Sequence, residues 1–309
     1  MNRPILIILV GPTGVGKTEL SLRLAEAFDA EIISSDSRQI YQQMPIGTAV
    51  ATQEEQSRIK HHFVQFLPPG TYYSAAQFER EVIEFLPKAF KSHPVMLMTG
   101  GSMLYVSAIC EGIDDMPTVT SEIREAVLKD YEENGLVPLL DELQEKDPQY
   151  FELVDRKNPK RVMHAIEIIR QTGETFTSFR VKKIKERPFE MIKIGLNRDR
   201  ATLHERINKR VDQMIVQGLI QEVQNLMPYK EHNSLNTVGY KELFAFFDGE
   251  MELDEAIAKI KTNTRNYARR QITWFKKDPT ITWFDMDTTS VETILDFVHK
   301  KIDTIQQVH

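Results

Sequence analysis

The chain has 309 residues, a formal net charge of −6 and one cysteine, Cys110. A single cysteine excludes an intramolecular disulfide and a multi-cysteine zinc site, which fits a reducing cytosol, and this length allows one large core plus a smaller unit. The apolar N-terminal run is too short for a signal peptide or a membrane span, so we expect a cytoplasmic protein that does not contact a membrane.

The first predicted element is a buried strand, Ile5–Val10, which is followed by the loop "GPTGVGKT" and an amphipathic helix. The glycines of this loop allow several backbone N–H groups to point into one concavity, and the start of the helix adds the positive end of its dipole. Such a loop binds a diphosphate or triphosphate, with the Lys17 ammonium on the terminal oxygens and the Thr18 hydroxyl on a Mg²⁺ ion. We therefore assign diphosphate binding to Gly11, Pro12, Thr13, Gly14, Val15, Gly16, Lys17 and Thr18. The loop alone does not decide whether the bound molecule is an energy source or a reactant.

Four further apolar runs predict strands, at residues 31–35, 95–99, 192–196 and 281–284. They alternate with amphipathic helices, which predicts an α/β fold: a P-loop-type parallel sheet covered by helices on both faces. The long stretch between the third and fourth strands has no convincing strand, and two helical patterns in it end in glycine. We therefore predict a catalytic core in residues 1–112 and 192–309 and a helical insertion in residues 113–191.

Asp36 is the only acid at a strand end near this loop, in "IISSDSRQIY". It is a candidate metal ligand, helix N-cap or general base, and the sequence leaves these alternatives open. A nucleotide hydrolase normally places an acid after a neighbouring apolar strand, for Mg²⁺ and water. Here the strand "VMLMT" is followed by "GGSMLY". The missing acid argues against hydrolysis.

Charge is spread unevenly along the chain. Acids dominate from Glu111 to Asp155, whereas Arg156–Lys193 and Lys259–Lys277 are strongly basic. The last segment contains no acid and interleaves aromatic residues with lysines and arginines, a pattern suited to RNA phosphates and unpaired bases. A solvated basic face explains that segment equally well. The adjacent pair His61 and His62 lacks metal-ligand spacing, and we expect it to be hydrogen-bonded.

Taken together, "GPTGVGKTELS", "DSRQIYQQMPIGTA", "GGSMLYVSAICEG", "NPKRVMHAIEI", "VGYKE" and "RRQITWFKK" resemble the tRNA dimethylallyltransferase (isopentenyl-tRNA transferase) family, in order over nearly the whole chain. The resemblance implies that the loop holds dimethylallyl diphosphate, a reactant. Its five-carbon group goes to N6 of the adenosine 3′-adjacent to the anticodon, in tRNAs that read codons beginning with U. Ser102 stands where the family has threonine, and with one cysteine the chain resembles the short bacterial form without a zinc finger.

The resemblance also implies roles for individual residues. Asp36 would be the general base, while Lys17, Thr18 with Mg²⁺, Arg210 and Ser102 would hold the departing diphosphate. Contacts to the tRNA anticodon stem-loop would come from Asp36, Ser37, Arg38, Gln39, Ser102, Arg124, Lys160, Arg161, Val162, Met163, His164, Arg265, Arg269 and Arg270. We expect a monomer. The alternatives are a P-loop kinase or NTPase acting on a small molecule, a prenyltransferase of free adenine nucleotides, and a non-catalytic RNA-binding module.

Overall fold

The computed structural model describes residues 3–181 and 184–307. The chain folds into two compact units, one of Met1–Cys110 with Glu186–His309 and one of Glu111–Lys185. The smaller unit therefore begins two residues before the predicted insertion, 113–191, and ends six residues before the predicted end of that insertion. Lys182 and Lys183 of the basic segment lie outside the described residues.

The larger unit is built on one parallel six-stranded sheet with the order β3-β2-β4-β1-β5-β6. The strands are β1 (Ile5–Val10), β2 (Ile32–Ser34), β3 (His61–His62), β4 (Val95–Thr99), β5 (Glu190–Asn197) and β6 (Thr282–Asp285). β1 is buried along its whole length, as a strand covered on both faces must be. Ile5 pairs with Val95 of β4 on one side and with Glu190 of β5 on the other.

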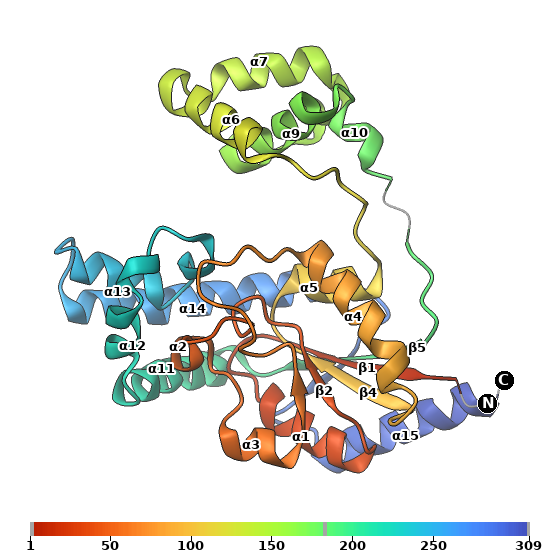
Figure 1. Ribbon diagram of the computed structural model, residues 1–309. Coiled ribbons are helices and arrows are strands. Elements are labelled where there is room, and N and C mark those ends of the chain that lie inside the picture. The colour runs from red at the N-terminus through yellow and green to blue at the C-terminus, as the bar shows by residue number, and fades with distance from the viewer. Residues whose placement is uncertain (1–2, 182–183, 308–309) are drawn as a thin grey trace. The chain divides into compact units, whose positions relative to one another are not determined.

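Helices cover both faces of this sheet (Figure 1). Those of the larger unit are α1 (Lys17–Ala27), α2 (Pro45–Thr48), α3 (Gln53–Arg58), α4 (Ala75–Ala89), α5 (Met103–Cys110), α11 (Arg200–Val216), α12 (Leu219–Asn225), α13 (Tyr240–Phe247), α14 (Leu253–Phe275) and α15 (Val291–Gln307), with the 3₁₀ turns η1 (Met227–Tyr229) and η2 (Asn233–Leu235). α1 and α15 pack on one face of the sheet and α4 and α5 on the other.

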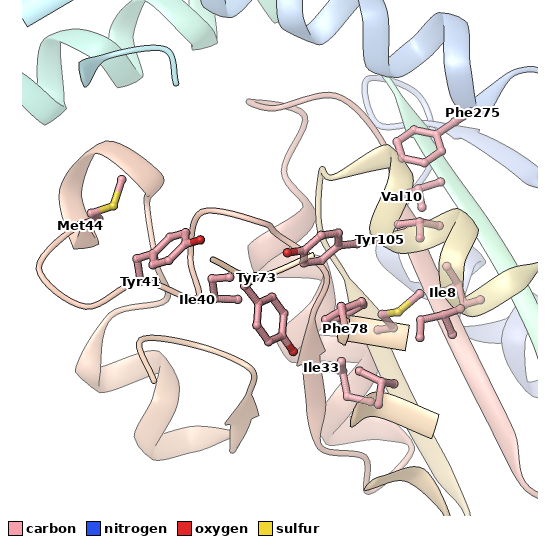
Figure 2. Close-up of a cluster of buried hydrophobic side chains, with 14 of the residues drawn as sticks. Ile8, Val10, Ile33, Ile40, Tyr41, Met44, Tyr73, Phe78, Tyr105 and Phe275 are labelled. Atoms are coloured by element: carbon pink, nitrogen blue, oxygen red, sulfur yellow. The ribbon is translucent and has the colours of Figure 1, made fainter. Parts of the chain in front are cut away.

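The alternation of side chains along β1 explains the two cores. Ile5, Ile7 and Leu9 point toward α1 and α15, while Leu6, Ile8 and Val10 belong to the cluster on the opposite face. Figure 2 shows that second cluster, in which Phe78 of α4 stacks on Tyr105 of α5 with ring centroids 4.4 Å apart. Burial of both faces fixes β1 at the centre, so the loop that follows it has a rigid base.

The smaller unit is helical and has its own core. It contains α6 (Ser121–Asn134), α7 (Val137–Lys146), α8 (Pro148–Leu153), α9 (Pro159–Thr172) and α10 (Phe176–Phe179). The two glycines expected to stop helices follow α6 and α9, and both have positive φ. Buried Asp147 caps α8 through the Tyr150 N–H and also accepts bonds from Thr177. One buried carboxylate thus joins two helix starts.

The predicted fold class is confirmed, and each of the five predicted strands is present. The two-residue strand β3 was not predicted because it is too short to give a pattern. Its histidines are hydrogen-bonded, His61 to the Ile59 carbonyl and His62 to the Glu31 carboxylate at 2.6 Å. None of the described helices is both long and apolar enough to cross a membrane.

Candidate active site

Three functional segments meet at one edge of the sheet. The P-loop (residues 11–18) follows β1, Asp36 lies two residues after β2, and the Gly100–Ser102 turn follows β4. These strands are neighbours in the order β2-β4-β1, and the carboxyl ends of parallel strands share one edge. The fold therefore gathers groups that are far apart in the sequence.

The backbone of the P-loop is held in a conformation that favours glycine. Gly11, Gly14 and Gly16 have φ of 149°, 81° and 112°, and a Cβ on Gly11 would lie 2.8 Å from the Leu196 carbonyl oxygen. Positive φ at these positions is a conformation that side chains other than glycine rarely adopt, and it allows the tight turns that a phosphate-binding loop requires.

Cationic side chains bind the carbonyl oxygens of this loop. Lys17 Nζ donates to the Gly11 and Pro12 carbonyls, both at 2.9 Å. Arg198 Nε donates to the Val15 carbonyl at 2.9 Å, and Arg206 Nε donates to the Gly14 carbonyl at 2.8 Å. With its carbonyls held by these donors, the loop presents a positively charged surface to an anion.

Burial, together with the nearby charge of Arg210, lowers the pKa of Lys17 to about 7, and the negative charge of Asp36 offsets part of this effect. Burial likewise lowers the pKa of Arg210, which Asp36 raises and Arg206 lowers. Two partly desolvated cations beside one carboxylate leave an excess of positive charge. An incoming diphosphate would neutralise that excess.

Asp36 uses one carboxylate oxygen to stabilise a turn. Oδ1 accepts from the backbone N–H of Arg38 at 2.9 Å and of Gln39 at 3.4 Å. The segment it caps is a turn and not a helix, so the N-cap alternative is corrected to a turn cap. Within the described part of the chain, Oδ1 carries the hydrogen bonds of this side chain, and Oδ2 lies toward Gly101. One oxygen positions the carboxylate and leaves the other for chemistry.

Ser102 is 9% exposed and bonds to the residue after Asp36. Its Oγ accepts from the Ser37 N–H at 2.8 Å and donates to Ser37 Oγ at 3.0 Å. The Ser102 hydroxyl therefore holds the turn that carries Asp36. The Tyr267 hydroxyl of α14 also lies within hydrogen-bonding reach of Ser102.

Two cavities adjoin at these groups. A cavity of about 330 Å³ is lined by Asp36, Ser37, Arg38 and Ser102, with Tyr267 and Arg270 of α14. A larger cavity of about 950 Å³ is lined by Lys17, Thr18 and most residues of the segment 45–56. Six residues line both cavities: Thr13, Asp36, Thr48, Arg210, Met214 and Tyr267. Asp36 and Arg210 thus lie where the cavity beside the P-loop meets the second, smaller one.

The predicted RNA-binding residues of α14 differ in their surroundings. Arg270 lines the smaller cavity, with its guanidinium 5.7 Å from the Tyr267 ring centroid. Arg269 is exposed, whereas Arg265 donates to Asn208 Oδ1 at 2.6 Å and to Thr262. Of the three arginines, the structure brings Arg270 to the site.

The predicted RNA-binding residues of the helical unit need one correction. Lys160, Arg161 and Arg124 are exposed there, and His164 is exposed beside Glu167. Val162 is 0% exposed in the core of that unit, so its side chain is not available to RNA. Met163 packs partly against the same core.

Sequence reasoning missed two buried polar residues around the site. The Glu222 carboxylate accepts from the Ile46 and Gly47 N–H groups and from the Tyr240 hydroxyl at 2.6 Å, which holds α2 against the cavities. Gln271 bonds to Thr13 and Gly101. Both stand in helical patterns, and only the tertiary structure reveals partners so distant in sequence.

The Thr18 hydroxyl fits as one ligand of a magnesium ion. Thr18 lines the larger cavity with the P-loop, and Mg²⁺ prefers oxygen ligands and keeps several waters. Among the described residues no group of three acidic, histidine or cysteine side chains could hold a metal alone. The remaining ligands would be phosphate oxygens and water.

Comparison with known proteins identifies the family of the chain. The family model described as "IPP transferase" matches residues 39–278. The chain belongs to the IPP transferase family. Its relatives include tRNA dimethylallyltransferase 2 of Parabacteroides distasonis, 57% identical over 284 residues (92% of this chain and 95% of that protein), and tRNA dimethylallyltransferase 1 of Bacteroides fragilis, 57% identical over 284 residues (92% and 94%).

Solved structures of similar proteins share the fold. The tRNA isopentenylpyrophosphate transferase of Bacillus halodurans is 33% identical, with a TM-score of 0.75 and coverage of 99% of each chain. A eukaryotic dimethylallyltransferase acting on tRNA is 24% identical, with a TM-score of 0.82 over 97% of this chain and 80% of that one, and it shows the fold alone.

Proposed function

We propose that the chain transfers the dimethylallyl group of dimethylallyl diphosphate to N6 of the adenosine 3′-adjacent to the anticodon, in tRNAs that read codons beginning with U. One observation carries the proposal: Lys17, Thr18 and Asp36 line the same cavity. A group that binds diphosphate and a carboxylate able to accept a proton therefore face one reaction space. Family membership supports the same reaction.

The reaction needs one bond made and one broken. The N6 lone pair attacks the first carbon of the allylic chain, the bond from that carbon to the diphosphate oxygen breaks, and the N6 proton passes to Asp36 Oδ2. Adenine N6 is a weak nucleophile because its lone pair is delocalised into the ring. A base at the N–H and a stabilised leaving group are therefore both required.

The departing diphosphate gains negative charge as the bond breaks. Arg210 and protonated Lys17 place positive charge at the larger cavity, and the N–H dipoles of the P-loop would add to it, which stabilises that negative charge. A bound Mg²⁺ held by the Thr18 hydroxyl would supply further neutralisation of the phosphate oxygens.

The adenine must leave its stack to reach Asp36. The smaller cavity, with Tyr267 and Arg270 in its wall, is the proposed space for the extruded base. Lys160, Arg161 and Arg124 would bind the anticodon stem-loop through its phosphates. We also propose that the enzyme acts in the cytoplasm as a monomer.

The alternatives lack a comparable support. A kinase or NTPase would use an acid at the end of β4, where Gly100, Gly101 and Ser102 stand. A prenyltransferase of free adenine nucleotides would not need the exposed basic residues of α9 and α14.

The test is incubation with labelled dimethylallyl diphosphate and Mg²⁺, with unmodified tRNA, AMP and ATP in parallel reactions. We expect label in tRNA alone, and none when the target adenosine is replaced by guanosine. Label in AMP, or ATP hydrolysis without transfer, would contradict the proposal.

A further inference from the structure

Gln271 of α14 joins the P-loop to the turn after β4. Its side chain is 1% exposed, and both ends of its amide are bonded. Oε1 accepts from the Thr13 backbone N–H at 2.9 Å, and Nε2 donates to the Gly101 carbonyl oxygen at 2.9 Å. One side chain therefore bridges two loops from different strands.

The chemistry of the partners fixes the orientation of this amide. A backbone N–H only donates and a carbonyl only accepts, so the oxygen must face Thr13 and the NH₂ group must face Gly101. The fit around Gly101 is tight, because a Cβ there would lie 2.4 Å from Gln271 Nε2. Tyr267, one helical turn earlier on α14, also donates its hydroxyl to the Gly101 carbonyl at 3.0 Å.

The bridge lies where the sheet no longer holds the chain. The paired register of β1 and β4 ends at Leu9 and Thr99. Thr13 and Gly101 both lie beyond that point, in loops. Ser102, the residue after Gly101, binds the Ser37 N–H next to Asp36. Hydrogen bonds and short stretches of backbone therefore connect the P-loop, through Gln271, to the turn that carries the carboxylate.

We propose that Gln271 is a positioning residue that sets the separation between the bound diphosphate and the Asp36 carboxylate. This inference rests on the proposed function. In-line displacement requires the nucleophile, the base and the leaving group to keep a fixed spacing, and a misplacement of about 1 Å can cost about 10²-fold in rate. Gln271 acts through Thr13 and Gly101, since both of its polar ends are occupied by protein.

A glutamine suits this position better than the residues of similar shape. Methionine fills the space but bonds to neither loop. Glutamate could accept from the Thr13 N–H, but it would set an anionic oxygen against the Gly101 carbonyl and place a negative charge beside the incoming diphosphate. A neutral group that donates at one end and accepts at the other meets both needs.

The experiment measures single-turnover transfer with Gln271→Met, Gln271→Glu and Gln271→Asn, whose amide is one methylene too short to span both partners. Enzyme is in excess over labelled tRNA and dimethylallyl diphosphate is saturating. Under these conditions the rate constant reports the folded enzyme only, so a merely structural role would change the melting temperature and not the rate. Gln306→Met, on the exposed side of α15, is the matched control.

We expect the rate constant of all three Gln271 variants to fall by about 10²-fold. For Gln271→Met, the dissociation constants of tRNA and of dimethylallyl diphosphate should stay within about threefold of the wild-type values. Tyr267→Phe combined with Gln271→Met should show less than additive losses, because both residues hold the same carbonyl. A rate constant for Gln271→Met within threefold of wild type would overturn the inference while leaving the proposed function intact. Weaker substrate binding at an unchanged rate would also overturn it. A wild-type protein that transfers nothing would overturn the proposed function and the inference with it.

Discussion

Replacing Asp36 by Asn removes a proton acceptor while keeping the turn. The asparagine oxygen can still accept from the Arg38 and Gln39 N–H groups, as Oδ1 does in the wild type. The other end becomes an NH₂ group, which cannot take a proton from adenine N6. General-base catalysis contributes about 10²–10⁴-fold, so we expect the single-turnover rate constant to fall by that factor.

The assay follows labelled dimethylallyl transfer at saturating substrates, with far-ultraviolet circular dichroism and a thermal melt as checks of the fold. Asp199→Asn is the matched control. Asp199 Oδ1 also accepts from two backbone N–H groups, those of Ala201 and Thr202, but Asp199 is exposed and does not line either cavity. Its variant should transfer at the wild-type rate.

A loss smaller than about tenfold in Asp36→Asn would refute the assignment of the base. The carboxylate would then serve as a turn cap or a metal ligand. Asp36→Ala separates these roles further, because it removes the cap as well and should lower the melting temperature, which Asp36→Asn should not.

Three further predictions concern the surroundings of the site. Lys17→Ala removes a cation that faces the leaving group, so the rate constant of transfer should fall by about 10²–10³-fold while the affinity for tRNA stays within about threefold of wild type. A normal rate constant at saturating substrates would show that Lys17 does not act on the diphosphate. Replacing exposed Arg269 and Arg270 by Gln should reduce the slope of log tRNA affinity against log salt concentration by about 0.7–0.9 for each phosphate that is no longer neutralised. Lys300→Gln on α15 is the control and should leave the slope unchanged. An unchanged slope in the Arg269 and Arg270 variant would show that α14 does not contact the RNA phosphates. The Glu222 carboxylate accepts from three donors and is 9% exposed, so Glu222→Gln sets an amide NH₂ group against one of those donors. Urea unfolding should then show a free energy of unfolding lower by about 1–3 kcal/mol. An unchanged urea midpoint would mean that α2 is held by its other contacts.

The sequence predicts those parts of the structure that depend on residues close together in the chain. β1, from Ile5 to Val10, is a continuous apolar run, so its burial could be predicted, and the glycine loop that follows it could be placed at the end of this strand. Asp36 could be singled out because it follows a strand and no other acid does so near the loop. Its use of a single oxygen for the turn required the structure.

The unpredicted parts depend on partners far apart in the chain. Gln271 and Glu222 read as ordinary helical residues, and their bonds to Thr13 and to Ile46 form only when α14 and α12 pack beside the P-loop and α2. Val162 illustrates the opposite error. Its helical spacing with Ile166 and Ile169 marks it as a core residue, but the resemblance assigned the whole segment to RNA.

The most direct measurement is mass spectrometry of an anticodon stem-loop RNA after reaction with dimethylallyl diphosphate and Mg²⁺. The proposed function predicts a five-carbon addition to the adenosine 3′ of the anticodon and to no other nucleotide, with one diphosphate released for each addition. Release of diphosphate without modification of that adenosine, or addition at other positions, would contradict it.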